Sequence, residues 1–199
     1  SGSALTLSTS QLTVAKNTAL GTQNLSKNST NIKIGSYAFT ASSADGVTIS
    51  TISVTAGAAA GTSFQNLKVM VSGTQFGVTQ GTLSNNQVVS FSGAQFTVPK
   101  GGTTYVDVYA DVLSGASSND PASILSGLSG TGVTSYNSVS LASAVNGQGV
   151  TIAGQPTLLV ASDSATPAAS QLVMGSTGQV LAAFRFTETS NVENVKITD

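Results

Sequence analysis

The chain has no cysteine, no histidine and no tryptophan among its 199 residues. Without cysteine there is no disulfide framework, so a secreted form must take its stability from a packed core or from assembly. Zinc sites are built mainly from cysteine and histidine, so a zinc centre is close to excluded. Histidine is also the usual base that activates a catalytic serine, and the motif Gly-x-Ser-x-Gly does not occur. The sequence therefore predicts a protein that is not an enzyme and has no cofactor.

Charged side chains are also scarce. Seven Lys or Arg and eight Asp or Glu give a net charge of −1, and charged residues make up 8% of the chain, against about 25% in typical soluble domains. No basic stripe could follow a phosphate backbone, so we expect no nucleic-acid partner. Low net charge removes the repulsion that keeps copies of a protein apart, so we expect a homo-oligomer or polymer.

No apolar run approaches the about 18 residues of a membrane-spanning helix, so we predict no transmembrane segment. Polarity comes instead from hydroxyl groups, because Ser and Thr together supply 57 residues. An apolar fraction of 40% with little net charge is unlike that of disordered chains. From this hydroxyl-rich composition we expect a folded protein that is secreted and lies at the cell surface.

Apolar and polar residues alternate with a period of two along most of the chain, which is typical of β-strands with one buried face. In the clearest strand, 105–112, valine and alanine occupy the even positions, whereas Tyr105, Asp107, Tyr109 and Asp111 occupy the other face. About ten such short strands, at roughly ten-residue spacing, predict an all-β fold, and within it an immunoglobulin-like β-sandwich.

Local signals predict some of the connections between strands. Asp45-Gly46 lies between two alternating runs and predicts a hairpin. Asp120-Pro121 has the pattern of an N-cap followed by the first residue of a helix, and predicts one helical turn at 121–125. The small residues of 56–63 predict a loop.

The sequence repeats part of itself. Residues 34–40 (IGSYAFT) reappear as 181–187 (LAAFRFT) at an offset of 147, with aromatic residues at the fourth and sixth positions of both. The strand that follows, 47–50 (VTIS), reappears as 195–198 (VKIT) with one residue inserted. A chain that begins the same strand pattern again is built from repeated domains, and here we expect the second domain to be only started.

We therefore predict a complete β-sandwich domain over 1–155, followed over 156–199 by a partial second repeat or strand-donating segment. Two or three strands are marginal in water on their own. The second segment must then complete its sheet elsewhere, either by adding strands to a neighbouring subunit or as part of a longer repeat array. The alternating Leu5 and Leu7 are a second candidate donor strand.

Four stretches carry a family resemblance: 37–40 (YAFT) with 47–49 (VTI) after it, 96–111 (FTVPKGGTTYVDVYAD), 150–154 (VTIAG) and the restart at 163–168 (DSATPA). In this order they resemble the tandem β-sandwich, immunoglobulin-like repeat domains of large S-layer-like cell-surface proteins of candidate-phyla bacteria. The resemblance covers nearly the whole chain and implies a secreted structural or adhesive role in the cell envelope. It assigns no catalytic residue, because the shared patterns are structural.

Tyr105 and Tyr109 are the candidate ligand or subunit contacts. They lie on the polar face of one predicted strand, roughly 13 Å apart, a spacing that suits separate sugar rings. With Phe76 they could form an aromatic platform for a glycan. More often, tyrosines at such positions pack under a neighbouring strand or at a contact between subunits, and we favour this interpretation.

A few charged residues leave other readings open. Calcium is the one ion that the sequence supports at all, through Asp107, Asp111 and Asp120, but the first two lie roughly 13 Å apart along one strand face, too far to bind one ion directly. We favour the interpretation of the three aspartates as solvated strand and cap positions. Lys33 and Lys68 lie within predicted strands and are the candidates for an intramolecular isopeptide bond, which needs a buried lysine beside a carboxylate.

Asn24-Leu25-Ser26 and Asn28-Ser29-Thr30 match the acceptor pattern for asparagine glycosylation, in a polar loop. In a chain so rich in Ser, Thr and Asn, chance explains these matches equally well.

The leading hypothesis is a non-enzymatic extracellular structural protein that self-assembles into a surface filament or S-layer-like lattice through contacts between β-strand edges. The alternative is a cell-surface adhesin or carbohydrate-binding module. Large ordered particles would favour the first hypothesis. Saturable binding to a glycan would favour the second.

Overall fold

The computed structural model describes residues 12–154, 157–167, 174–189 and 195–198, and it divides the chain into two compact units, Ser1–Ala153 and Gly154–Asp199. Strands make up nearly all of the regular structure in these ranges, and the one helix described, α1 (Ala60–Ser63), is a single turn. The predicted all-β class is confirmed. The helical turn lies within 56–63, where the sequence predicts a loop.

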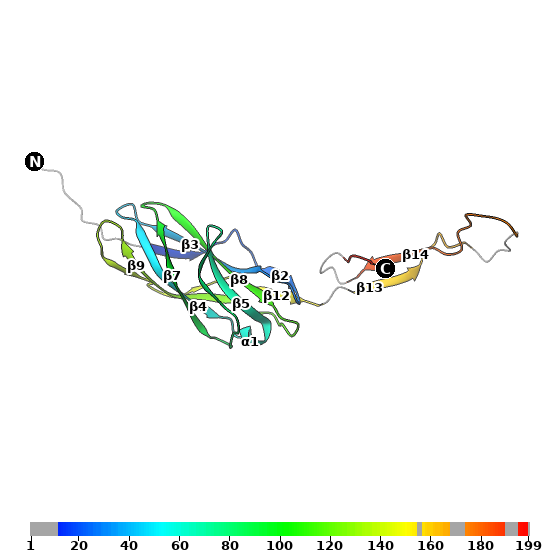
Figure 1. Cartoon of the computed structure of the whole chain (residues 1–199), viewed down its shortest axis with the longest axis horizontal. Coiled ribbons are helices and arrows are strands. Elements are labelled where there is room, and N and C mark those ends of the chain that lie inside the picture. Colours follow the sequence, from blue (N-terminus) through cyan, green and yellow to red (C-terminus); the bar gives the residue numbers. More distant parts are fainter. Residues whose placement is uncertain (1–11, 155–156, 168–173, 190–194, 199) are drawn as a thin grey trace, which may run out of the picture. The chain divides into compact units, whose positions relative to one another are not determined.

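The first unit contains two five-stranded sheets (Figure 1). In the first sheet each strand pairs antiparallel with its neighbours, in the order β1-β3-β8-β5-β6. The bounds are β1 (Leu12–Lys16), β3 (Ile32–Ala41), β8 (Thr103–Val112), β5 (Phe64–Val71) and β6 (Thr74–Gln80).

The second sheet has the order β10-β9-β4-β7, with β11 also pairing with β9. Its strands are β10 (Ser138–Ser140), β9 (Ser123–Gly132), β4 (Val47–Ala56), β7 (Val88–Val98) and β11 (Val145–Asn146). A separate parallel pair joins β2 (Gln23–Ser26) to β12 (Val150–Ala153), the last strand of the unit.

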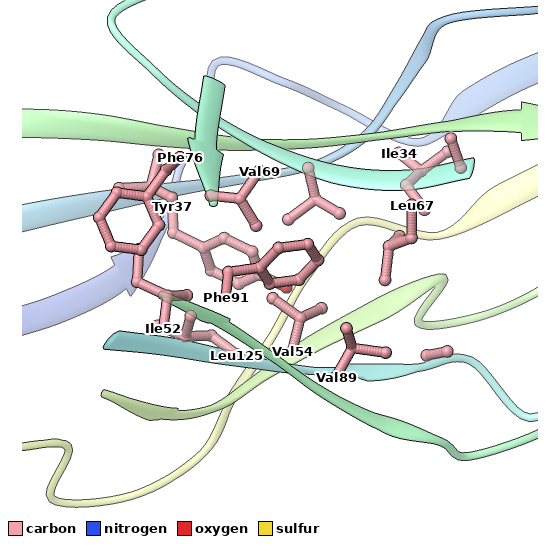
Figure 2. Packing of buried hydrophobic residues seen from close by; sticks show 14 of the residues in the cluster. Ile34, Tyr37, Ile52, Val54, Leu67, Val69, Phe76, Val89, Phe91 and Leu125 are labelled. Carbon is pink, nitrogen blue, oxygen red and sulfur yellow. The ribbon is translucent and has the colours of Figure 1, made fainter. Parts of the chain in front are cut away.

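The hydrophobic core lies between the facing sides of these two sheets. Figure 2 shows Tyr37 of β3 and Val69 of β5 in the same cluster as Val54 of β4 and Phe91 of β7. Strands of both sheets thus bury one side of each alternating pattern against the other sheet, which is the arrangement of a β-sandwich.

A β-bulge in β4 keeps its apolar side chains on the buried face. The buried residues are Val47 and Ile49, then Ile52 and Val54, so the pattern changes from odd to even positions. The pairing of β4 with both β7 and β9 shifts between Ile49 and Thr51, which is where the change occurs. One extra residue in a strand moves every later side chain to the other face, so the shift restores the burial.

The predicted hairpin at Asp45-Gly46 is wrong, because this turn joins β3 to β4 and these strands belong to different sheets. Asp45 is buried, and its carboxylate accepts hydrogen bonds from the backbone N–H groups of Thr134 and Ser135, each at 3.0 Å. The bonds from Ser135 and Thr134 hold the pKa of Asp45 well below its ordinary value. The aspartate therefore fixes the turn that follows β9.

The predicted helical turn at 121–125 is also wrong. Residues from Ser123 onward belong to β9, where Ser123 pairs with Ala56 and Leu125 pairs with Val54. Leu125 is buried in the core. Pairing with a central strand and burial of Leu125 outweigh the local helix signal.

The second unit contains one antiparallel strand pair, β13 (Leu158–Ser162) and β14 (Phe184–Glu188), among its described residues. In this pair Leu158 lies opposite Glu188 and Val160 lies opposite Phe186. The predicted donor strand around Leu5 and Leu7 lies outside the described residues.

Candidate functional site

The outer face of β8 carries the two candidate tyrosines. Tyr105 is 51% exposed and lies opposite Ala38 of β3. Tyr109 is partly buried, and its register neighbours are Lys33 of β3 and Lys68 of β5. The Lys33 ammonium lies 5.6 Å from the centre of the Tyr109 ring, within the range of a cation–π contact. Tyr105 is thus open to solvent, whereas Tyr109 is covered in part by a neighbour.

Phe76 does not join the tyrosines. It is buried on the inner side of β6, and its ring meets Phe96 of β7 edge-on, with 5.5 Å between the ring centres. The interpretation of all three aromatic residues as one platform is therefore wrong, because Phe76 belongs to the core (Figure 2).

Lys33 and Asp107 form an ion pair on the outer face of the sheet, with 2.6 Å between Nζ and Oδ2. The hydroxyl of Ser36 donates to the other carboxylate oxygen, also at 2.6 Å. Partial burial acts to lower the pKa of Lys33, but the hydrogen bond and charge of Asp107 outweigh it and raise the pKa above its ordinary value. An isopeptide bond forms from a neutral amine, and the raised pKa keeps Lys33 charged at neutral pH. The geometry therefore favours an ion pair over an isopeptide bond at Lys33.

Asp111 is held by two asparagines. The side-chain amide of Asn66 donates to Oδ2 at 2.7 Å, and the backbone N–H of Asn31 donates to Oδ1 at 2.6 Å. These bonds lower the pKa of Asp111. Asp120 lies exposed in the connection between β8 and β9. In the part of the chain that the structure describes, no three Asp, Glu, His or Cys residues are grouped so as to hold a metal ion.

The two sequon asparagines are both exposed, Asn24 in β2 and Asn28 in the turn that follows. Asn28 has φ of 63°, in the left-handed region that asparagine tolerates better than most residues. The turn is closed by the Ser29 hydroxyl, which donates to the carbonyl of Ser26 at 2.7 Å. The turn geometry is by itself a reason for an asparagine at position 28.

A hollow of about 380 Å³ opens at one end of the first unit, between the β5–β6 hairpin and β7. Its lining is mainly apolar, with polar groups at several positions. The residues include Val71, Gln75, Phe76, Gln95, Phe96 and Pro99. Its volume falls at the low end of the range of about 300–1,000 Å³ that small-molecule sites occupy.

The β13–β14 pair exposes an apolar face. The exposed fractions are 37% for Leu158, 51% for Val160, 63% for Phe184 and 51% for Phe186. Successive residues of a strand point to opposite sides, so these four side chains share one face of the pair. We call these four residues the hairpin face. Exposed apolar clusters of this kind are typical of interaction surfaces.

Gln148 is a structurally important residue that no sequence signal identifies. It is buried, and its Oε1 accepts a hydrogen bond from the backbone N–H of Ser36 at 2.8 Å. Its Nε2 donates to the carbonyls of Asn17 at 2.8 Å and Leu20 at 3.0 Å. One side chain thus ties the segment before β12 to β3 and to the turn after β1.

Compared with protein-family models, with curated proteins and with solved structures, the chain has no match. Within the described ranges, no helix combines the length and the hydropathy that a membrane span requires.

Proposed function

We propose that this chain is a non-enzymatic structural subunit, secreted to the cell surface, that associates with copies of itself or with similar domains to build a filament or an S-layer-like lattice. The hairpin face carries this proposal, because it leaves two phenylalanines, a leucine and a valine exposed on a strand pair. A two-stranded pair is marginal in water on its own, so burial of this face against a partner supplies the missing stability.

Composition and surface charge support the same role. The net charge is −1, so electrostatic repulsion between copies is weak. Hydroxyl pairs lie across neighbouring strands on the outer surface, such as Thr40 with Thr103 at 2.8 Å and Thr48 with Thr97 at 3.0 Å. Such faces can exchange hydrogen bonds with a partner without burying charge.

Electron microscopy of the purified chain tests this proposal. We expect ordered filaments or sheets at neutral pH and at concentrations that leave a charged, monomeric protein of the same size dispersed. The same preparation with added calcium checks for a role of the ion in assembly. Particles that remain single at every concentration, with and without calcium, contradict the proposal.

The hollow beside Phe76 and Phe96 favours a second function, that of an adhesin or carbohydrate-binding module. Its apolar floor and its glutamines, Gln75 and Gln95, suit a ring with hydroxyl groups around it. Saturable binding on a glycan array, weakened by Gln95→Ala, supports this function, and the absence of binding contradicts it.

A further inference from the structure

The β13–β14 pair has the same register as β1–β3 of the first unit. Leu12, Val14 and Lys16 lie opposite Ala41, Phe39 and Tyr37. Leu158, Val160 and Ser162 lie opposite Glu188, Phe186 and Phe184. Each residue of β13 corresponds to the residue 146 positions earlier, and each residue of β14 to the residue 147 positions earlier.

The turn after the first strand is also the same in both units. The backbone N–H of Asn17 donates to the carbonyl of Ser36 at 3.0 Å, and its side-chain oxygen accepts from the N–H of Ala19 at 3.1 Å. In the second unit, Asp163 makes both bonds, to the carbonyl of Ala183 and from the N–H of Ala165, each at 2.9 Å.

The turn before the second strand of each pair matches as well. Asn28 and Asn31 have φ of 63° and 55°, and the residues 147 positions later, Gly175 and Gly178, have φ of 89° and 72°. Ser-Thr lies between them in both segments. Two left-handed residues at the same spacing direct the backbone of both segments along the same path into the strand.

In the first unit, other strands complete this strand pair. The edge of β3 that faces away from β1 pairs with β8, with Tyr37 opposite Val106 and Ala38 opposite Tyr105. Tyr37 and Phe39 are 0% exposed there. In the second unit, no strand among the described residues pairs with the other edge of β14.

We propose that the edge of β14 that faces away from β13, which pairs with no strand among the described residues, is a strand-acceptor site, and that its occupant is an extended segment of the β8 type. Such a segment carries branched apolar side chains at alternate positions, as β8 does with its buried valines. It pairs antiparallel with β14, in the register that β8 adopts on β3, and covers part of the hairpin face. The site deepens the proposed function and rests on it, since it names a point of contact through which subunits join.

One position distinguishes the preferred occupant from β8 itself. Arg185 occupies the place of Ala38, so the residue opposite it lies at the position of Tyr105. Lys33 and Ser36, which hold Asp107 of β8, are replaced by Val180 and Ala183. The β14 edge therefore favours an aromatic or acidic residue opposite Arg185, and it has no counterpart to the Lys33 and Ser36 groups that hold the aspartate of β8.

A synthetic peptide of residues 103–112 (TTYVDVYADV) tests the site on the full chain labelled with ¹⁵N. We expect saturable, equimolar binding that shifts and protects the backbone amides of Phe184–Glu188 and leaves those of β3 unchanged. The same peptide with Val106→Asp and Val108→Asp is the matched control, and we expect it not to bind. A peptide with Tyr105→Glu should bind the chain about as well, and bind an Arg185→Glu chain about threefold more weakly.

Two chain variants locate the contact. Phe184→Ser with Phe186→Ser should weaken peptide binding about tenfold or more, because the apolar contact is lost. Leu159→Ser, on the opposite face of the same strand pair, should change binding less than about twofold. Equal affinity for the double variant overturns the proposal, as do shifts confined to the first unit.

A tethered peptide removes the limit set by weak affinity. In this variant, residues 103–112 are joined to the end of the full chain by a short flexible Gly/Ser linker. Such a linker gives the tethered peptide an effective concentration on the order of mM. Slower hydrogen exchange at the amides of β14 supports the acceptor site, and unchanged exchange overturns it. The particle mass could also double without being reversed by added free peptide. That result would indicate that the β13–β14 pairs of two chains join to each other, and it would also overturn the acceptor site.

The outcome is separable from that of the proposed function. A chain that binds the peptide yet stays single in electron microscopy contradicts assembly and supports the acceptor site. A chain that forms ordered filaments without binding the free or tethered peptide supports assembly and overturns the acceptor site.

Discussion

The strand pairs β1–β3 and β13–β14 share one register and one set of turn hydrogen bonds, but their surroundings differ. Tyr37 and Phe39 are enclosed by the second sheet of the first unit, whereas Phe184 and Phe186 at the same positions face solvent. Local sequence is therefore sufficient for the path of the strands, while burial depends on elements distant in the chain. The exposed pair is the surface that a partner covers in the proposed assembly.

The largest expected effect comes from truncating one phenylalanine in each pair. Phe39→Ala should lower the free energy of unfolding of the first unit by about 3–5 kcal/mol, because it leaves a cavity in the core. Phe186→Ala should change the same quantity by less than about 0.5 kcal/mol. All four tyrosines lie between Tyr37 and Tyr136, so tyrosine fluorescence during guanidinium unfolding reports on the first unit alone. Equal effects of the two substitutions would remove the contrast between the units.

Gln148 sharpens the comparison, because it secures the turn after β1 from a distant segment. Gln148→Ala leaves the buried N–H of Ser36 and the carbonyls of Asn17 and Leu20 without this partner. We expect a loss of about 2 kcal/mol in the free energy of unfolding of the first unit. Gln95→Ala, at an exposed position, is the matched control and should cost less than about 0.5 kcal/mol. A similar small change for both variants would show that the buried bonds of Gln148 contribute little.

Tyr37→Phe has the smallest expected effect, since it makes β3 resemble β14 at this position. The hydroxyl of Tyr37 lies 3.0 Å from that of Ser123, and its loss should cost about 1 kcal/mol at neutral pH. Burial raises the pKa of Tyr37 to about 12, from 10.0. The unfolded state therefore loses this proton first, and stability falls as the pH rises from 10 to 12. The variant should lose less stability than the parent chain over this interval in guanidinium titrations. Parallel losses in the two proteins would exclude Tyr37 as the cause.

Much of the fold could be predicted from alternation and from the repeat. The pattern at 105–112 gives β8 almost residue by residue, with its valines buried and Tyr105 exposed. The repeat at 34–40 and 181–187 marks the strands β3 and β14. Both signals are local, because a strand with one buried face repeats every two residues wherever it lies in a sheet.

The errors concern contacts between distant residues. Asp45-Gly46 has the composition of a hairpin, but whether β3 and β4 pair is decided by the sheet that each one joins. Asp120-Pro121 has the composition of a helix start, but Leu125 is more stable buried opposite Val54. For the same reason, the sequence does not show that Phe76 and the tyrosines lie on opposite faces of their sheet. Phe76 is buried on the inner face, whereas Tyr105 is exposed on the outer face. Local patterns predict strands, and long-range packing decides their partners.

Whether the hairpin face drives assembly can be measured directly by sedimentation velocity of the full chain over a range of concentrations. We expect species larger than the 19.7 kDa monomer that increase with concentration, and their loss in the Phe184→Ser, Phe186→Ser variant. The Leu159→Ser variant should assemble like the parent chain. A parent chain that sediments as a monomer at every concentration, or a double variant that assembles unchanged, would contradict this account.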